Sequence, residues 1–117
     1  MEYQYRHRVI EVQLRDYLQN FSVLGITGPR QSGKSTLIRH VLKDYQYVTF
    51  DDFRLREFIT DDPIGFIETY HDKVIFDEAQ KAPEIFELVK IAVDKDRTQH
   101  GKFVLTGSSQ FSLLQKD

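Results

Sequence analysis

Two glycines, a lysine and a serine stand at the spacing of a phosphate-binding loop. Residues 28–35 read Gly-Pro-Arg-Gln-Ser-Gly-Lys-Ser, which fits the Walker A pattern G-x-x-x-x-G-K-[ST]. Glycines let backbone N–H groups turn inward around phosphate oxygens, and a helix beginning near Lys34 would direct its positive dipole end at the same anion. The pattern predicts a nucleoside triphosphate site formed by Gly28, Pro29, Arg30, Gln31, Ser32, Gly33, Lys34, Ser35 and Thr36.

Two residues of this loop have specific tasks in the predicted site. The Lys34 side chain is expected to reach the β- and γ-phosphates as a catalytic cation, and the Ser35 hydroxyl is expected to be a ligand of Mg²⁺. A surface turn that happens to carry a lysine is the plainer alternative. A strand-length apolar run before the loop and a helical pattern after it argue against that alternative.

An acidic pair follows a second apolar run. Residues 74–76 read Val-Ile-Phe and are followed by Asp77 and Glu78. The carboxyl end of a parallel strand faces the ligand crevice, so Asp77 is expected to hold Mg²⁺, through a water molecule. Glu78 is expected to polarise the water that attacks the γ-phosphate. The alternative is that Asp77 and Glu78 are two solvated acids at a strand end. Next to a phosphate loop, however, an Asp-Glu pair favours hydrolysis over transfer to an acceptor hydroxyl.

Alternating strands and helices must position these residues. Helical spacing predicts a lead helix over residues 8–20, and apolar runs predict strands at 23–26, 47–50, 74–76 and 103–105. Asp62-Pro63 and Pro83 are typical of helix starts. Such an alternation predicts an α/β fold with a parallel sheet and right-handed crossovers.

Three segments together resemble a known family. They are residues 28–37, residues 76–83 (Phe-Asp-Glu-Ala-Gln-Lys-Ala-Pro) and residues 103–110 (Phe-Val-Leu-Thr-Gly-Ser-Ser-Gln). They are similar to bacterial and archaeal AAA-like P-loop ATPases that carry a separate C-terminal domain of unknown function. The resemblance implies ATP and Mg²⁺ as ligands, a three-layer αβα core with five parallel strands in the order 5-1-4-3-2, and the roles given above for Lys34, Ser35, Asp77 and Glu78.

The same resemblance implies that residues 1–117 are an incomplete ATPase domain, with a lead helix at 1–20 and a nucleotide-binding core at 21–117. The fifth strand, an arginine finger, a second sensor and the C-terminal domain are expected beyond it. Strand 23–26 would then be an edge strand with no Lys or Pro to prevent pairing with another chain. We therefore expect self-association, or cover of this edge by the missing domain.

Ser108 follows the fourth predicted strand. In ATPases of the resembling type, a polar side chain at this place senses the γ-phosphate or positions the attacking water, so Ser108 or Ser109 is a candidate sensor. A helix N-cap at Ser109 is the structural alternative.

The composition excludes several other kinds of site and classes of protein. A net charge of −2 gives no global signal for nucleic acid, and the lack of cysteine excludes disulfides, cysteine-ligated zinc and thiol catalysis. The four histidines show no metal-ligand spacing, and no apolar run is long enough for a signal peptide or membrane span. We expect a cytoplasmic protein that does not enter the membrane.

Three functions fit these observations. Binding and hydrolysis of Mg·ATP is the first. The second is a nucleotide-binding module that does not turn over and serves interaction or regulation. A small-molecule kinase is the third, although no second-substrate motif or arginine-rich lid supports it.

Overall fold

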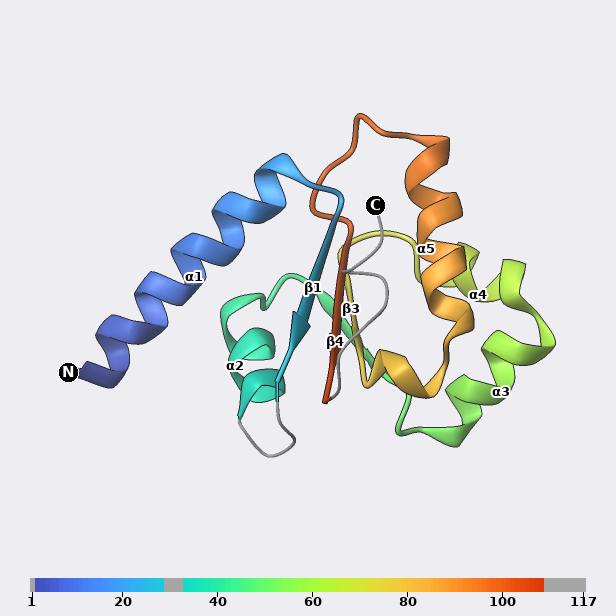
Figure 1. Cartoon of the computed structure of the whole chain (residues 1–117), viewed down its shortest axis with the longest axis horizontal. Coiled ribbons are helices and arrows are strands. Elements are labelled where there is room, and N and C mark those ends of the chain that lie inside the picture. Colours follow the sequence, from blue (N-terminus) through green and yellow to red (C-terminus); the bar gives the residue numbers. More distant parts are fainter. Residues whose placement is uncertain (1, 29–32, 109–117) are drawn as a thin grey trace.

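Helices and strands alternate along the chain, as the sequence predicts. The computed structural model describes residues 2–28 and 33–108, with side chains from residue 8 onward (Figure 1). Its elements are α1 (Glu2–Asn20), β1 (Val23–Thr27), α2 (Lys34–Val41), β2 (Gln46–Thr49), α3 (Phe53–Asp61), α4 (Pro63–Thr69), β3 (Val74–Asp77), the 3₁₀ turn η1 (Ala79–Lys81), α5 (Glu84–Lys95) and β4 (Phe103–Gly107).

The four strands form one parallel sheet in the order β1-β4-β3-β2. This order agrees with the implied order for the first four strands. In the register, Thr27 of β1 lies opposite Gly107 of β4, and Thr49 of β2 lies opposite Asp77 of β3. All four strands therefore end at the same edge of the sheet, and this edge receives both the phosphate loop and the acidic pair.

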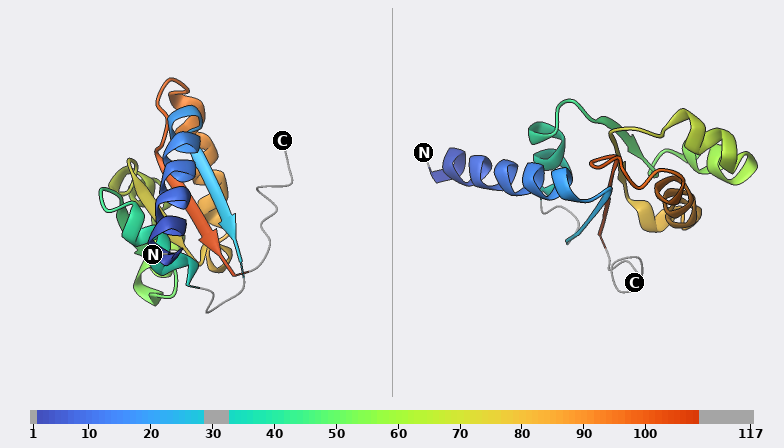
Figure 2. Two further views of the ribbon diagram at one scale, coloured as in Figure 1. Left: turned by 90° about the vertical axis from the view of Figure 1, so that its left-hand side faces the viewer. Right: turned by 90° about the horizontal axis from the view of Figure 1, so that it is seen from above.

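Helices cover both faces of the sheet, which confirms the three-layer α/β/α prediction. Helices α1 and α2 lie on one face, and α3, α4 and α5 lie on the other (Figures 1 and 2). The alternation of side chains along β3 serves both layers: Val74 and Phe76 enter the cluster under α3–α5, while Ile75 enters the cluster under α1 and α2. Continuous apolar runs are what a sheet covered on both faces requires.

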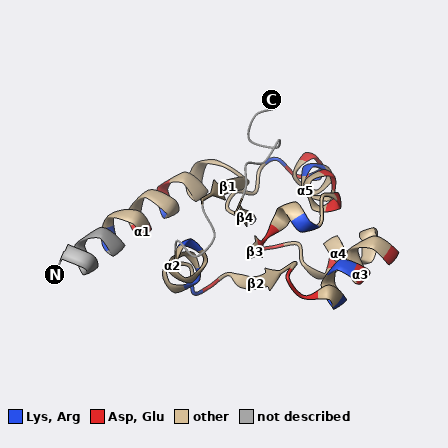
Figure 3. Ribbon diagram, turned by 60° about the horizontal axis from the view of Figure 1, so that its bottom comes forward, with Lys and Arg blue, Asp and Glu red and all other residues tan. Residues whose placement is uncertain are grey.

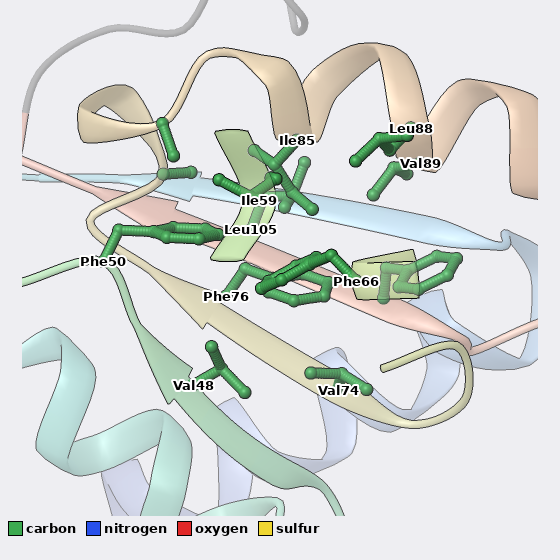
Figure 4. Packing of buried hydrophobic residues seen from close by; sticks show 13 residues of the cluster. Val48, Phe50, Ile59, Phe66, Val74, Phe76, Ile85, Leu88, Val89 and Leu105 are labelled. Atoms are coloured by element: carbon green, nitrogen blue, oxygen red, sulfur yellow. The ribbon is translucent and has the colours of Figure 1, made fainter. Parts of the chain in front are cut away.

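Aromatic rings fill the larger of the two cores. The ring of Phe66, from α4, lies 5.7 Å from Phe50 and 5.9 Å from Phe76 between centroids, and Phe76 lies 6.0 Å from Phe103 of β4. All four side chains are fully buried, as the close-up in Figure 4 shows for three of them. This cluster ties α4 to the middle of the sheet.

Local signals set most helix boundaries. Asp62 caps α4 by accepting a hydrogen bond from the Gly65 amide at 3.0 Å, with Pro63 in the first turn, as predicted. Asp52 caps α3 in the same way through the Arg54 amide at 2.9 Å. The lead helix begins at Glu2 and not at residue 8. The helix expected after Ser109 lies outside the described residues.

No helix within the described part of the chain has the length and apolar character needed to cross a bilayer.

Two phenylalanines test the core. Phe66→Ala should lower the free energy of unfolding by about 3–5 kcal/mol, because it leaves a cavity among four other rings. Phe53→Ala is the matched control: this ring, also on a helix, is 59% exposed and should cost about 0.5 kcal/mol or less. Urea denaturation of both variants measures the difference, and equal losses would contradict the packing described here.

Candidate functional site

The two ends of the phosphate loop are anchored at the carboxyl edge of the sheet. The Gly28 amide donates to the Gly107 carbonyl at 3.3 Å, which holds the loop start beside the end of β4. Gly33 has φ +82° and is the N-cap of α2, so Lys34 is the first helical residue. A Cβ on Gly33 would meet nothing within 4 Å, so the left-handed backbone, and not lack of space, is what favours glycine.

The start of α2 is suited to an anion. Gly33 provides no side-chain cap, and the first turn has no acidic residue, so its N–H groups and dipole are directed into the loop. The predicted binding residues Pro29, Arg30, Gln31 and Ser32 lie outside the described residues. Gly28, Gly33, Lys34, Ser35 and Thr36 occupy the strand end and the helix start, as a phosphate loop requires.

The carboxylate of Asp77 is the meeting point of the site. Its Oδ1 accepts hydrogen bonds from the Thr106 hydroxyl at 2.6 Å and from the Glu78 amide at 2.9 Å. Its Oδ2 accepts from the Tyr47 hydroxyl at 2.6 Å. The Ser35 hydroxyl lies close enough to this carboxylate to help lower its pKa. Three strands and the start of α2 therefore converge on one side chain that is only 4% exposed.

These contacts set the protonation states of the Asp77 carboxylate and the Tyr47 hydroxyl. Burial raises the pKa of Asp77, but the hydrogen bonds from Thr106, Tyr47 and the Glu78 amide, together with the nearby Ser35 hydroxyl, outweigh it and leave the pKa below the ordinary 3.8. Burial, followed by the hydrogen bond to Asp77, raises the pKa of Tyr47 to about 12. At neutral pH Asp77 is therefore an anion and Tyr47 a donor.

The contact between Ser35 and Asp77 brings together the two predicted Mg²⁺ ligands. An ionised carboxylate and a hydroxyl are hard oxygen donors, the kind that Mg²⁺ takes. Within the described residues, no group of three or more His, Asp or Glu side chains could hold a metal without help. That small donor set fits Mg²⁺, which keeps several waters and completes its shell with substrate phosphates. The residues present thus fit a nucleotide-borne Mg²⁺.

Glu78 lies directly beyond this ligand pair in an unusual backbone conformation. It has φ 55° and ψ 46°, the left-handed region that non-glycine residues rarely adopt. Such strain costs on the order of 1–3 kcal/mol and is concentrated at functional sites. The conformation turns the chain from β3 into η1 at the sheet edge, and Figure 3 shows acidic residues following both β3 and β2 there.

A small polar network positions the Glu78 carboxylate. Its Oε1 accepts from Gln80 Nε2 at 2.7 Å and from the Ser108 hydroxyl at 3.4 Å, while Gln80 Nε2 also donates to Ser108 Oγ at 3.2 Å. Within the described residues, the Gln80 Oε1 atom is a buried acceptor without a hydrogen-bond partner.

Three residues of the site were not predicted from the sequence. Tyr47 lies in an apolar strand and resembles a core residue; its ring also carries the Arg39 guanidinium at 4.0 Å. Thr106 and Gln80 stand within the motif-bearing segments, next to predicted residues, so position could have drawn attention to them. Nothing in the sequence marks Tyr47, because its role depends on β2 pairing with β3.

Comparison with known proteins gives a family match that agrees with the fold. Residues 20–117 match the family described as "AAA domain". Two similar proteins, described as uncharacterized, come from Mycobacterium bovis and Mycobacterium tuberculosis; each is 32% identical over 103 residues, covering 87% of this chain but 23% of the relative. The chain thus spans under a quarter of the length of these relatives. No solved structure matches it.

The stability cost of removing one hydrogen-bond donor to Asp77 should depend on pH. A lowered pKa stabilises the fold fully above the ordinary 3.8, and this contribution is lost as pH falls through the lowered value. Thr106→Val should therefore cost about 1.5–3 kcal/mol of unfolding free energy at pH 7, and the cost should shrink once Asp77 is protonated.

Urea denaturation from pH 7 downward measures this dependence. Thr69→Val is the matched control, because Thr69 is an exposed threonine of α4 whose hydroxyl, among the described residues, bonds only to a backbone carbonyl. A Thr106→Val cost that does not change with pH would contradict the charge-assisted hydrogen bond.

Proposed function

This chain belongs to the AAA domain family, and from that premise we propose that it binds Mg·ATP at residues 28–36 and hydrolyses it to ADP and phosphate. The observation that carries the proposal is the buried Asp77 carboxylate at the edge of the sheet where the helix with Lys34 and Ser35 begins, with Glu78 as the next residue. Metal donors and a candidate base for water are then adjacent to the loop that would hold the phosphates.

Binding rests on the loop and on the start of α2. The α2 amides and the backbone N–H groups of the loop would hold phosphate oxygens, and Lys34 would place its ammonium on the β- and γ-phosphates. Ser35 and Asp77 would hold Mg²⁺. When bound, Mg²⁺ supplies positive charge that offsets the phosphate charge. Asp77 is ionised at neutral pH, so it needs no proton release to act as a ligand.

Turnover rests on Glu78 and its two neighbours. Water oxygen attacks the γ-phosphorus, the bond from that phosphorus to the β–γ bridging oxygen breaks, and ADP leaves with the bond's electron pair. A water proton passes to the Glu78 carboxylate. Gln80 and Ser108 hold Glu78 Oε1 in place. Ser108 also lies at the end of β4, where it can report on the γ-phosphate.

The two other functions have less support. A small-molecule kinase would need a site for an acceptor, and the sequence has no second-substrate motif or arginine-rich lid. A binding module without turnover has one favourable observation: among the described strands, β1 pairs only with β4, so one of its edges is open to another chain. Self-association, or cover of that edge by a further domain, stays a prediction, as does the cytoplasmic location.

Lys34 tests nucleotide binding. Lys34→Ala should weaken Mg·ATP affinity at least about tenfold, or 1.4 kcal/mol, because it removes the cation that reaches the phosphates. Lys43→Ala, an exposed lysine just beyond α2, is the matched control and should bind as the wild type does. Calorimetric titration compares them. Equal affinity of wild type and Lys34→Ala would overturn binding through this loop.

Glu78 tests turnover separately from binding. Glu78→Gln keeps an oxygen that can accept from Gln80 and Ser108 but cannot take a proton, so phosphate release should fall about 10²-fold or more while ATP affinity stays nearly unchanged. Asp77→Asn should instead weaken the dependence of binding on Mg²⁺. Wild-type turnover by Glu78→Gln would show that the role assigned to Glu78 is wrong.

A further inference from the structure

Tyr47 contacts both halves of the candidate site. It lies half-buried in β2, and the pairing of β2 with β3 lets its hydroxyl donate to Asp77 Oδ2 at 2.6 Å. A second contact joins its ring to α2, the helix that follows the phosphate loop, where the Arg39 guanidinium lies 4.0 Å from the ring centroid. Tyr47 therefore links the acidic strand end to the helix of the loop.

The hydrogen bonds on Asp77 determine where a metal could approach its carboxylate. A carboxylate offers about four acceptor positions, two on each oxygen. The Thr106 hydroxyl and the Glu78 amide take the positions on Oδ1, at 2.6 and 2.9 Å, while the Tyr47 hydroxyl takes one on Oδ2. The remaining position, on Oδ2, suits Mg²⁺ or a water that Mg²⁺ carries, and the tyrosine hydroxyl sets its direction. Ser35, the other predicted ligand, lies close to the same carboxylate.

Arg39 extends this link along α2. It stands four residues after Ser35, so the two side chains lie on the same face of the helix, one turn apart. Ser35 lies near Asp77 and Arg39 lies over Tyr47, so α2 meets the sheet at two neighbouring points. Arg39 is exposed, and a cation over an aromatic ring contributes less at an exposed site than at a buried one. Its share of the link is therefore smaller than that of the tyrosine hydroxyl.

We propose that Tyr47 is a positioning residue for Mg²⁺ in this site, with Arg39 holding its ring in place. The inference rests on the proposed function, because Ser35 and Asp77 are metal ligands only if that function is correct. Hydrogen-bond donors orient the carboxylates that bind metals, and their loss typically weakens metal binding about 10–100-fold. A donor also draws negative charge away from the carboxylate, and its loss on that ground alone would strengthen metal binding. The sign of the effect therefore separates orientation from charge.

Tyr47→Phe removes the hydroxyl and keeps the ring under Arg39. Calorimetric titration with ATP, once in Mg²⁺ and once in EDTA, gives the factor by which the metal tightens ATP binding. This factor should fall about tenfold in Tyr47→Phe, while the affinity in EDTA stays that of the wild type. Arg39→Met keeps an apolar stem and loses the charge, and it should lower the same factor by only about twofold.

Tyr45→Phe is the matched control. Tyr45 is half-buried like Tyr47, and its hydroxyl also donates at 2.6 Å, but to the Gly101 carbonyl and not to the acidic pair. Each variant loses one hydrogen bond, so urea denaturation should show a loss of stability in both. Only Tyr47→Phe should change the Mg²⁺ factor, because a merely structural role would lower stability without changing it.

Carbon NMR of the wild-type chain with labelled tyrosines gives a second readout, which does not depend on the folding of a variant. Addition of Mg²⁺ to the ATP-bound chain should shift the Cζ signal of Tyr47 and leave that of Tyr45 in place.

The outcomes separate this inference from the function on which it rests. A wild-type ATP affinity that is equal in Mg²⁺ and in EDTA would overturn the Mg·ATP proposal and the role of Tyr47 together. A normal wild-type dependence with an unchanged or larger factor in Tyr47→Phe, or a Tyr47 Cζ signal that does not move, would overturn the role of Tyr47 alone. A wild-type factor in Arg39→Met would overturn the part assigned to Arg39.

Discussion

The buried carboxylate of Asp77 is the interaction on which the site depends. It accepts hydrogen bonds from Tyr47 on β2, from Thr106 on β4 and from the amide that follows it, and the Ser35 hydroxyl of α2 lies close enough to help lower its pKa. One acid on β3 thereby joins both neighbouring strands to the helix that carries the phosphate loop. Burial alone would favour its neutral form; the number of donors reverses that preference. The donors from Tyr47, Thr106 and the Glu78 amide keep the carboxylate charged, and the charged carboxylate lies beside Ser35.

This arrangement has a consequence for the residue that follows. Once the Glu78 amide is committed to Asp77 Oδ1, the chain must turn sharply into η1, and Glu78 takes the left-handed conformation. The Lys81 amide then donates to the Glu78 carbonyl at 3.0 Å, which closes the turn. The backbone strain at Glu78 is therefore held in place by its neighbours, and the carboxylate is fixed between Gln80 and Ser108. The candidate metal ligand Asp77 and the candidate base Glu78 are therefore positioned by one turn of the chain.

The two ends of β4 lie in different surroundings. At its carboxyl end, Thr106 and Ser108 contact the acidic pair, in a polar network. At its amino end, Lys102 lines a hollow between α4 and α5 that has both apolar and charged residues in its wall. Between them, Phe103 and Leu105 pack under α5 while Val104 packs under α1 and α2, so a fully buried strand connects the two places.

The sequence by itself determined what depends on local order. Gly28, Gly33, Lys34 and Ser35 predicted the phosphate loop, Asp62-Pro63 predicted a helix start, and apolar runs predicted four parallel strands, since backbone freedom, capping and periodicity act over a few residues. The adjacency of Asp77 and Glu78 to that loop followed from parallel strands ending at one edge.

Only the tertiary structure decided the contacts between distant residues. Tyr47 resembled core until the pairing of β2 with β3 placed its hydroxyl on Asp77. Burial and hydrogen-bond partners are properties of the packed chain, and no local pattern encodes them.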